Sequence, residues 1–271
     1  MKPEKPNGKL KTLKGIISDL DSVVVAFSGG VDSTLLAKLS HDVLGEKALA
    51  VTASSETYPP HELEAAKRLA KEIGITHLII ETKELEIEGF SDNPPERCYF
   101  CKSELFGKLR DIAESEGYAS VADGANLDDT QDYRPGSKAA EELGVHSPLK
   151  EAGMTKDDIR AVSEELGLTT WDKPAYACMS SRFPYGEEIT LDGLARVSAA
   201  EGFLREMGFG QFRVRHHRTI ARLELAPEDF STAMDKRTEI IDKLKEIGYT
   251  YVTLDLQGYR TGSMNEVLNK K

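Results

Sequence analysis

A short apolar segment that runs directly into SGGVDS and then into a helical pattern constrains the fold of this chain most. Ser22 to Phe27 is rich in valine and bounded by polar residues, which is typical of a strand buried on both faces. Val31 to Leu44 carries leucines at helical spacing and ends before Gly45, a common helix stop. A buried strand followed at once by a helix indicates an α/β protein.

The same alternation continues through the first two-thirds of the chain. Apolar runs predict strands, and periodic segments that end near glycines predict helices. The predicted elements are strand 48–53, helix 61–73, strand 77–81, helix 102–115 and strand 120–123. This order predicts an α/β fold, a doubly wound parallel sheet with helices on both faces.

The pattern changes toward the C-terminus. Residues 128–185 are predicted to be irregular apart from one helix, Thr155 to Leu166, which Thr155 and Asp158 introduce as a capping box. The following predicted elements are helix 191–207, strands 212–216 and 221–225, helix 227–247 and strand 251–256. We therefore expect residues 1–186 to form the first domain and 187–271 a smaller α+β domain.

Composition excludes several classes of protein. The chain has 46 Asp and Glu against 35 Lys and Arg, a net charge of −11, which argues against a nucleic-acid partner. No run approaches the roughly 20 apolar residues of a membrane span. The polar first residues lack the apolar core of a secretory signal, so a cytoplasmic location without a membrane partner is expected.

The loop SGGVDS has the properties of a phosphate site. Glycines let the backbone approach phosphate oxygens, and a helix N-terminus favours an anion. No lysine follows the glycines, so the loop is not of the Walker type. A glycine-containing turn is the alternative, but the full string after a buried strand favours phosphate binding. The predicted contacts are Ser28, Gly29, Gly30, Val31, Asp32 and Ser33.

SGGVDS also resembles the pyrophosphate loop (PP-loop) of the ATP pyrophosphatase superfamily. The resemblance implies an adenine nucleotide alpha hydrolase-like fold that binds ATP and adenylates a substrate oxygen, with Asp32 among the catalytic residues. DGANLDD at 123–129 resembles the second nucleotide motif of that superfamily and follows a strand, at the sheet edge where open α/β folds bind ligands. Its carboxylates could reach Mg²⁺, although a solvated turn is the alternative. The predicted contacts of this motif are Gly124, Asn126, Asp128 and Asp129.

Three cysteines occur, and this odd number argues against a disulfide framework. Cys98 and Cys101 form a CxxC pair in a predicted loop just before a helix, and Cys178 follows much later. Three thiolates suit a four-iron four-sulfur cluster with one open iron, or a zinc ion that lacks its fourth ligand. A thioredoxin-like redox pair and buried inert cysteines are further alternatives.

The residues around Cys178, ACMSSRFPYG, indicate a particular family within this superfamily. Together with YRPG at 133–136, FRVRHH at 212–217 and TLDLQGYRTGSMNE at 253–266, they resemble the LarE family of ATP-dependent sulfur transferases. That family acts on pyridinium biscarboxylic acid mononucleotide during synthesis of the nickel-pincer nucleotide cofactor of lactate racemase. The resemblance implies adenylation of a carboxylate, replacement of oxygen by sulfur, and a homo-oligomer.

Two forms of this chemistry occur in the family. Members with a single cysteine, at the position of Cys178, give up its sulfur and keep dehydroalanine. The presence of Cys98 and Cys101 resembles the other form, in which three cysteines hold an iron–sulfur cluster whose open iron carries sulfide. We favour the cluster form, and another metal stays possible from the residues alone.

Basic residues near the second predicted domain suggest a phosphate site. Arg213 and Arg215 alternate along a strand, so both side chains leave one face. The resemblance implies that they bind the substrate phosphate, whereas a solvated face or ion pairs with Glu224 are the alternative. Arg182 is predicted to neutralise the adenylate or the substrate carboxylate. Glu201 resembles a metal-contact position, but a surface glutamate is the favoured interpretation.

Two other functions compete with this interpretation. A cluster-dependent tRNA thiolase would keep the chemistry but needs an extended basic surface, which a net charge of −11 does not favour. A nucleotide-binding regulatory module with a structural metal would bind ATP without turnover. The sequence favours the enzyme with a small nucleotide as substrate.

Overall fold

The computed structural model describes residues 6–131, 135–174 and 177–268, so Tyr133, Arg134 and Tyr176 lie outside the described residues. The chain divides into two compact units. The first comprises Met1–Lys83 and Glu96–Tyr176, and the second comprises Glu84–Pro95 and Ala177–Lys271. No helix of the described residues has both the length and the apolar character needed to cross a membrane.

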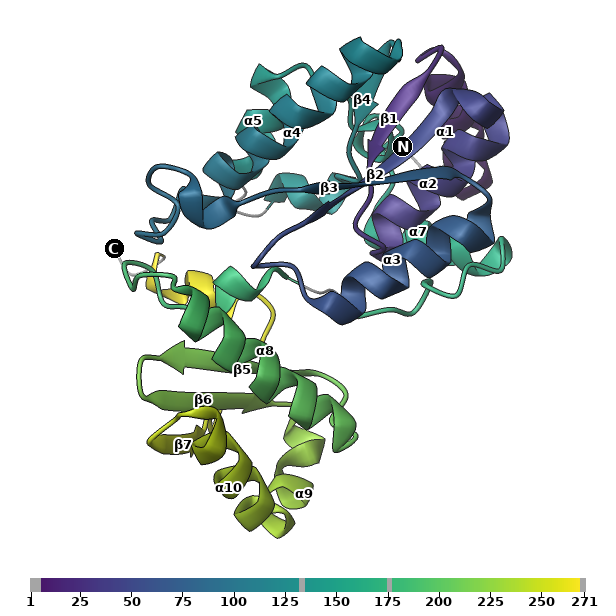
Figure 1. Cartoon of the computed structure of the whole chain (residues 1–271). Helices are drawn as coiled ribbons and strands as arrows, with labels where there is room; N and C mark the ends of the chain where they lie inside the picture. Colours follow the sequence, from purple (N-terminus) through teal and green to yellow (C-terminus); the bar gives the residue numbers. More distant parts are fainter. Residues whose placement is uncertain (1–5, 132–134, 175–176, 269–271) are drawn as a thin grey trace. The chain divides into compact units, whose positions relative to one another are not determined.

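The first unit is built on a four-stranded parallel sheet in the order β3-β2-β1-β4 (Figure 1). Val25 of β1 lies opposite Ala50 of β2 and Ala122 of β4, and all three side chains are buried or nearly so. The strands are β1 Val23–Ala26, β2 Ala48–Ser54, β3 Thr76–Glu81 and β4 Ser120–Ala122. The predicted parallel α/β fold is confirmed.

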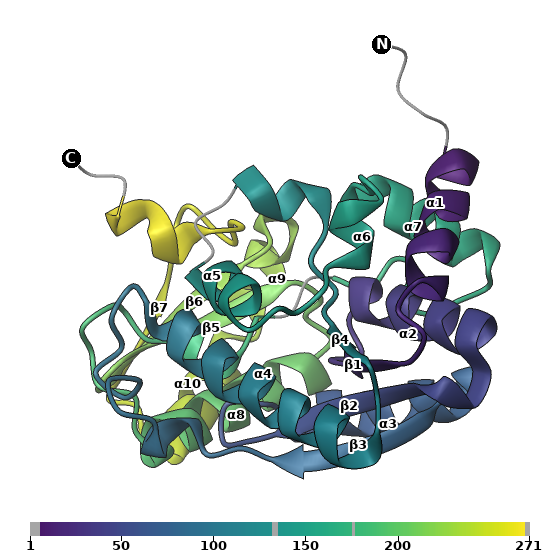
Figure 2. The ribbon, with the colours of Figure 1, turned by 90° about the horizontal axis from the view of Figure 1, so that it is seen from above.

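Helices cover both faces of this sheet. On one face, α1, α2, α3 and α7 share an apolar core that includes Leu13, Leu35 and Ile159. On the other face, α4 and α5 lie side by side (Figure 2) and bury Phe106 and Ala139 against Val24. The helices are α1 Pro6–Ser18, α2 Val31–Leu44, α3 Pro60–Ile73, α4 Arg97–Glu116, α5 Pro135–Glu142, α6 Pro148–Glu151 and α7 Lys156–Glu165.

Three short 3₁₀ elements connect these helices and strands. They are Gly45–Lys47, Glu84–Glu86 and Leu127–Gln131.

Three helices of the first unit were not predicted from the sequence. α1 is largely polar, but Leu10, Leu13 and Ile17 lie on one face and pack on the core. α5 and α6 fall within 128–185, so the prediction that this segment is irregular apart from one helix is wrong. Both are short and begin at a proline, which favours the first turn of a helix but also resembles a loop signal.

The predicted capping box of α7 is confirmed. The Thr155 side chain accepts from the Asp158 backbone N–H, and the Asp158 side chain accepts from the Thr155 backbone N–H. Such reciprocal bonds satisfy backbone donors that a helix start leaves unpaired. The start of α7 is therefore held in one place.

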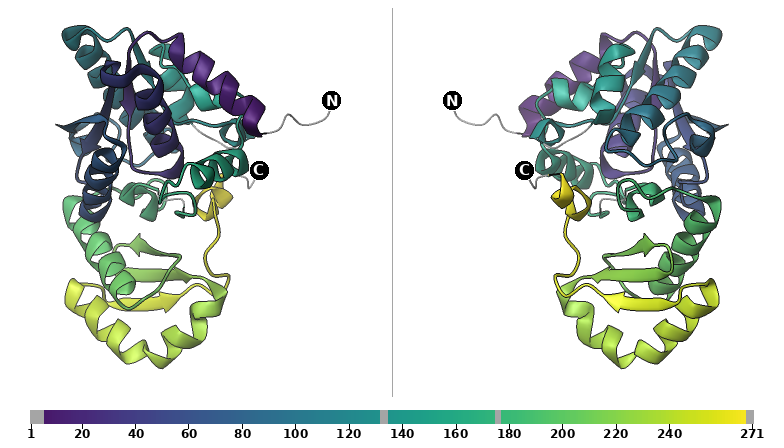
Figure 3. Two further views of the ribbon diagram at one scale, coloured as in Figure 1. Left: turned by 90° about the vertical axis from the view of Figure 1, so that its right-hand side faces the viewer. Right: turned by 90° about the vertical axis from the view of Figure 1, so that its left-hand side faces the viewer.

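The second unit contains a three-stranded sheet in the order β5-β6-β7 (Figure 3). β5 and β6 are antiparallel, whereas β6 and β7 are parallel. One face, which includes Val214 and Leu223, packs against Leu204 of α8 and Leu244 of α10. The elements are α8 Leu191–Glu206, β5 Phe212–His217, β6 Ile220–Leu225, α9 Phe230–Asp235, α10 Arg237–Ile247 and β7 Tyr251–Leu254, with 3₁₀ turns Met179–Arg182, Pro227–Asp229 and Ser263–Val267.

This smaller unit has the α+β character expected from the sequence. The single helix predicted over 227–247 is instead a 3₁₀ turn followed by α9 and α10. The two helices separate at Lys236, which leaves the helical conformation with φ −92° and ψ 11°.

An inserted segment belongs to the second unit although it lies between strands of the first. Asn93 Nδ2 donates to the carbonyl oxygens of Phe183 at 3.2 Å and Pro184 at 2.6 Å. Its own carbonyl accepts from the Gly186 N–H at 2.9 Å. Residues 84–95 are thus attached to the segment that follows Cys178, and the domain boundary between 186 and 187 stays a prediction.

Candidate functional site

The SGGVDS loop lies at the C-terminal end of β1 and opens α2. Gly30 is the N-cap of α2 with φ −80° and ψ 168°, and no side chain caps it within the described residues. The Ser33 hydroxyl accepts from the Ser28 N–H at 3.2 Å and lies 3.1 Å from the Ser28 hydroxyl. These bonds fold the loop around the helix start, where backbone N–H groups and the helix dipole favour an anion.

Two glycines permit close backbone packing at this loop. Gly29 has φ +64°, and a Cβ there would lie 3.2 Å from the Ala66 Cα. Gly124, in the loop after β4, lies so near Ser33 that a Cβ would be 3.0 Å from its backbone nitrogen. The structure therefore brings the two predicted nucleotide motifs together, on the neighbouring strands β1 and β4.

This position is the topological switch point of the sheet. The order β3-β2-β1 runs one way from β1, and β4 lies on its other side. Open α/β sheets bind ligands in the crevice at the carboxyl ends of the strands on either side of such a point. The two loops that flank it here are residues 28–33 and 123–129, as the sequence predicted.

The Asp32 carboxylate contacts the second motif through Oδ1 and Lys156, which lies outside both motifs, through Oδ2. Asn126 Nδ2 donates to Asp32 Oδ1 at 3.3 Å, and Lys156 Nζ donates to Asp32 Oδ2 at 2.5 Å. The Lys156 backbone N–H donates to Asp128 Oδ2 at 2.8 Å. Asp129 Oδ2 accepts from the Asn126 N–H at 3.0 Å, so this aspartate also organises the motif.

The SGGVDS loop is also supported by side chains that lie outside both nucleotide motifs, namely those of Tyr58, Glu62 and Lys173. The Tyr58 hydroxyl donates to the Ser28 carbonyl oxygen at 2.8 Å, and Lys173 Nζ donates to that of Gly29 at 3.0 Å. Lys173 Nζ also forms a 2.6 Å ion pair with Glu62. Burial, and then the nearby Glu62 charge, raise the pKa of Tyr58 well above its usual range, so its hydroxyl stays a donor.

Sequence reasoning missed Lys156, Lys173, Tyr58 and Glu62. Each lies far from SGGVDS along the chain and in no motif, so no spacing pattern connects it to the loop. A usable signal existed for Lys156 alone, because the capping box at Thr155 marks it as the first residue of a helix.

The cysteines are divided between the two units. Cys98 is exposed and Cys101 partly exposed, and both lie in the first turns of α4 in the first unit. The prediction that the pair precedes the helix is wrong, because α4 begins at Arg97. Residues three apart in a helix share a face, which keeps two thiols near each other.

Cys178 is exposed and belongs to the second unit, where it precedes the 3₁₀ turn Met179–Arg182. In neither unit do three His, Cys, Asp or Glu side chains of the described residues form a group that could hold a metal ion.

Arg182 is buried and holds the backbone around Cys178. Its Nε and Nη2 each donate to Glu201 at 2.8 Å, a bidentate pair. Its Nη1 donates to the carbonyl oxygens of Ala177 at 2.6 Å and Cys178 at 3.1 Å. The Arg182 side chain is 0% exposed, so the structure gives it these internal contacts, and a contact with an adenylate stays a prediction.

Glu201 corrects an expectation from the sequence. The interpretation as a surface glutamate is wrong, because the residue is 2% exposed. Burial alone would raise the pKa of Glu201, but the charge and hydrogen bonds of Arg182 and the Val214 N–H outweigh it and hold that pKa below its usual range. A buried carboxylate needs such partners because desolvation of a charge is costly.

Arg213 and Arg215 lie on one face of β5, as predicted. Arg215 Nη2 donates to Glu224 at 2.8 Å and to the Ser263 hydroxyl at 2.7 Å. Arg213 lies over the Tyr259 ring at 5.1 Å. The ion pair with Glu224 is thus present, yet the buried Arg215 Nε has no hydrogen-bond partner among the described residues.

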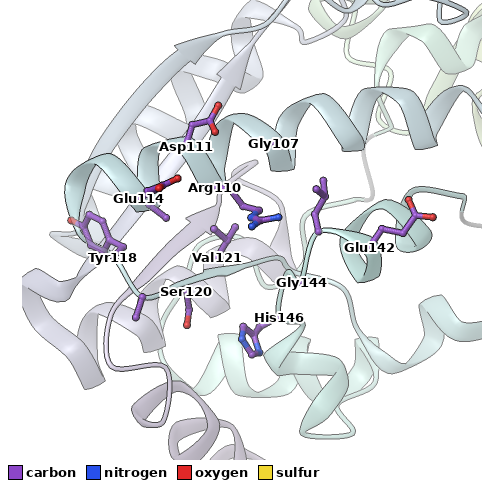
Figure 4. Close-up of a pocket in the computed structure, with 13 residues that line it drawn as sticks. Gly107, Arg110, Asp111, Glu114, Tyr118, Ser120, Val121, Glu142, Gly144 and His146 are labelled. Carbon is purple, nitrogen blue, oxygen red and sulfur yellow. The ribbon is translucent and has the colours of Figure 1, made fainter.

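A pocket of 940 Å³ lies elsewhere on the first unit (Figure 4). It is formed by α4, the start of β4 and the segment that carries Gly144 and His146. Ser120, the first residue of β4, lines it, whereas ligands of open α/β folds bind beyond the carboxyl ends of strands. None of the predicted site residues is among its described lining residues, and we do not assign it to the nucleotide.

Fold and loop together define an enzyme of the PP-loop class. The NAD synthase family matches residues 12–110, which include β1, SGGVDS and the CxxC pair. The chain is 43% identical to the pyridinium-3,5-bisthiocarboxylic acid mononucleotide synthase of Lactiplantibacillus plantarum, over 97% of this chain and 95% of that protein. The chain belongs to that synthase family, the LarE family.

Two further relatives differ in how much of the chain they match. An uncharacterised protein of Synechocystis is 48% identical over 97% of this chain and 98% of its own length. A tRNA-specific 2-thiouridylase of Caulobacter is 31% identical, but over 56% of this chain and 46% of its own length. Similarity to the thiouridylase is therefore confined to part of each protein.

Proposed function

We propose that this protein is an ATP-dependent sulfur transferase that converts a carboxylate of pyridinium biscarboxylic acid mononucleotide into a thiocarboxylate. The observation that carries the proposal is the 43% identity to a named mononucleotide synthase, over 97% of this chain. The SGGVDS loop at the switch point of the sheet supports it, because this geometry suits the phosphates of ATP.

The first step is adenylation. The β- and γ-phosphates of ATP bind residues 28–33, with Gly124, Asn126, Asp128 and Asp129 beside them. A carboxylate oxygen of the substrate forms a bond to the α-phosphorus, and the bond from that phosphorus to pyrophosphate breaks. The carboxylates of Asp128 and Asp129 would supply oxygen ligands to Mg²⁺, which would neutralise phosphate charge when bound.

The second step transfers sulfur. A sulfur nucleophile forms a bond to the activated carbonyl carbon, and the bond from that carbon to the AMP oxygen breaks. Activation is needed because a carboxylate oxygen is a poor leaving group, whereas AMP is a good one. One oxygen of the substrate leaves with AMP, and sulfur takes its place.

Cys98, Cys101 and Cys178 would hold a four-iron four-sulfur cluster in this proposal. The exposure of Cys98 and Cys178 and the position of Cys98 and Cys101 in one helical turn fit such ligation. When bound, a cluster with three protein ligands supplies an open iron that can carry sulfide. The chain contributes a held backbone at Cys178, through the Arg182 bonds to the carbonyls of residues 177 and 178.

The substrate phosphate is assigned to Arg213 and Arg215. Within the described part of the chain the Nε of Arg215 has no hydrogen-bond acceptor, and a phosphate oxygen would supply one. Arg182 acts as a positioning residue, because its guanidinium contacts the Cys178 loop rather than solvent.

The test is a reaction of the protein, reconstituted with iron and sulfide without oxygen, with ATP, Mg²⁺ and the mononucleotide. We expect AMP, pyrophosphate and a product whose mass has increased by the exchange of one oxygen for one sulfur. Release of AMP without sulfur incorporation would contradict sulfur transfer, and absence of pyrophosphate would contradict adenylation.

The sacrificial form of the chemistry gives a different result. A protein that donates the sulfur of Cys178 would turn over once and lose the mass of hydrogen sulfide. In the cluster form, turnover continues with added sulfide, and replacement of Cys98 by Ser abolishes it. Absorbance of an iron–sulfur cluster in the reconstituted protein distinguishes the two forms before any reaction.

A further inference from the structure

The C-terminal segment, residues 258–266, turns back onto the end of β6 shortly after β7 (the yellow end of the ribbon in Figure 3). The Tyr259 N–H donates to the Leu225 carbonyl oxygen at 2.7 Å. Gly258 has φ +71°, and a Cβ there would lie 2.8 Å from the same carbonyl oxygen. Only glycine fits such a close approach in this conformation, so the turn that begins the segment is held in one place.

The C-terminal segment contacts both arginines of the β5 face. The Tyr259 ring lies 5.1 Å from the Arg213 guanidinium. The Ser263 hydroxyl accepts from Arg215 Nη2 at 2.7 Å and donates to Glu224 Oε2 at 3.2 Å. The Glu224 side chain is fully buried, so Ser263 takes part in an internal ion pair and not in a solvated surface contact.

These contacts decide how the Arg215 guanidinium is oriented. Its Nη2 donates to Glu224 and Ser263, and its Nη1 donates to the Ser181 carbonyl oxygen at 2.6 Å. A guanidinium carries five N–H donors in a fixed plane, so contacts at both terminal nitrogens fix the direction of the Nε–H. Among the residues that the structure describes, this Nε has no acceptor. Ser263 therefore helps to set where the remaining donor of Arg215 points.

The same segment contacts the loop that carries Cys178. The hydroxyl of Tyr185, which follows Cys178 in that loop, donates to Asn265 Oδ1 at 3.0 Å. Asn265 and Ser263 belong to one 3₁₀ turn. One turn thus contacts Arg215 through one side chain and the Cys178 loop through another.

An arginine of the C-terminal segment connects its two ends. Arg260 Nη1 donates to the Gly258 carbonyl oxygen at 3.0 Å, and Arg260 Nε donates to Glu266 Oε1 at 3.0 Å. Ser263 and Asn265 lie between these two contacts. Their placement therefore depends on the turn at Gly258 as well as on their own hydrogen bonds.

We infer that Ser263 and Asn265 are positioning residues, through which the C-terminal segment fixes Arg215 relative to the Cys178 loop. The inference rests on the proposed binding of the substrate phosphate at Arg213 and Arg215 and on the proposed transfer of sulfur at Cys178. Sulfur must reach a carboxylate of a substrate whose phosphate is held elsewhere, and a misplacement of about 1 Å can slow a reaction about a hundredfold. Ser263 acts on substrate binding, and Asn265 acts on the rate of sulfur transfer.

Binding to the full chain, measured by calorimetry, tests Ser263 with two probes, the mononucleotide and the corresponding nucleoside without phosphate. Ser263→Ala should weaken mononucleotide binding about fivefold or more, because Arg215 loses a hydrogen bond that orients it. Binding of the nucleoside should change less than about twofold. Ser263→Thr keeps the hydroxyl and should recover most of the affinity. Thr261→Ala removes an exposed hydroxyl of the same segment and should bind like the unaltered protein.

Single-turnover rates of pyrophosphate release and thiocarboxylate formation by the reconstituted protein test Asn265. Asn265→Ala and Tyr185→Phe should each slow thiocarboxylate formation about tenfold, while the rate of pyrophosphate release changes less than about twofold. Asn265→Asp keeps an acceptor for the Tyr185 hydroxyl and should recover most of the rate. The double variant Tyr185→Phe/Asn265→Ala should be no slower than either single variant, because both changes remove the same hydrogen bond.

Several results would overturn the inference. They are equal losses of mononucleotide and nucleoside binding in Ser263→Ala, a loss as large in Ser263→Thr, an unchanged rate of thiocarboxylate formation in Asn265→Ala, and additive losses in the double variant. Failure of the unaltered protein to bind the mononucleotide or to release pyrophosphate would instead overturn the proposed function, and this inference with it.

Discussion

Charged side chains serve different purposes in the two units. At the SGGVDS loop, Asp32 and Lys156 are partly exposed, and Asp32 is the one acceptor of the Lys156 Nζ among the residues that the structure describes. In the second unit, Arg182 and Glu201 are buried, and each charge is matched by the other. The comparison teaches that exposure and spare hydrogen-bonding capacity distinguish a charge available to a ligand from one that holds a loop together.

Removal of one partner of the buried Arg182–Glu201 ion pair should lower the free energy of unfolding more than any other change considered below. Arg182→Met leaves the Glu201 carboxylate buried without its cation, and such losses cost about 3 to 5 kcal/mol. The free energy of unfolding in urea measures this. Glu206→Gln, on the exposed side of the same helix α8, is the control and should change it by less than about 0.5 kcal/mol.

The double variant Arg182→Met/Glu201→Met sharpens the comparison. With both charges gone, most of the lost stability should return, because no unpaired charge stays buried. Sulfur transfer should stay low, since the carbonyls of Ala177 and Cys178 have lost their donor. If sulfur transfer returned together with stability, Arg182 would be a structural residue without a role in positioning Cys178.

A fall in pH should weaken the ion pair between Arg182 and Glu201 and lower the stability of the chain. The pKa of Glu201 is lower in the folded chain than its usual value, chiefly because the charge and hydrogen bonds of Arg182 outweigh burial. The stability from this shift is present above the unfolded pKa, about 4.3, and is lost as pH falls through the folded pKa. Urea unfolding between neutral pH and pH of about 3 should show this loss, and Glu201→Gln should make the dependence shallower.

Gly29→Ala tests whether the backbone conformation of the SGGVDS loop is needed for ATP binding, and its effect on stability should be intermediate. The residue has φ +64°, and a Cβ there would lie 3.2 Å from Ala66 Cα. The left-handed conformation alone costs about 1 to 2 kcal/mol, and ATP binding should fall as the loop shifts. Gly15→Ala in α1, with nothing within 4 Å of the new Cβ, is the control and should stabilise the chain slightly. Equal ATP affinity for both variants would show that the loop geometry is not needed.

Thr155→Ala should have the smallest effect. Removal of the N-cap of α7 costs about 1 kcal/mol of stability. Because the cap also fixes Lys156, ATP affinity should fall modestly while AMP affinity does not. Thr155→Ser keeps the hydroxyl and serves as the control. If ATP affinity were unchanged in Thr155→Ala, the rigid start of α7 would have no part in nucleotide binding.

The sequence predicted the features that depend on local pattern. The strand, SGGVDS and helix unit is contiguous, so apolar spacing and glycine positions were enough to place it at the edge of a parallel sheet. The capping box at Thr155 was predicted for the same reason. The motif at 123–129 could be placed beside the loop because parallel strands bring their carboxyl ends to one edge.

Features that depend on tertiary contacts could not be predicted. Lys156 and Lys173 reach the loop from distant segments, and nothing in their neighbouring residues encodes it. Glu201 was interpreted as exposed because its burial depends on Arg182, which lies in another element. The start of α4 was placed too late because the CxxC pair resembles a loop motif, although it forms part of the helix.

One measurement tests the central claim most directly, namely the ratio of AMP released to thiocarboxylate formed. The reaction contains the anaerobically reconstituted protein, ATP, Mg²⁺, sulfide and the mononucleotide. Sulfur transfer through an adenylate predicts one AMP for each oxygen replaced by sulfur, over many turnovers. In Cys178→Ser, both AMP and thiocarboxylate should be absent or should form much more slowly. AMP formed without thiocarboxylate in the unaltered protein would contradict the account.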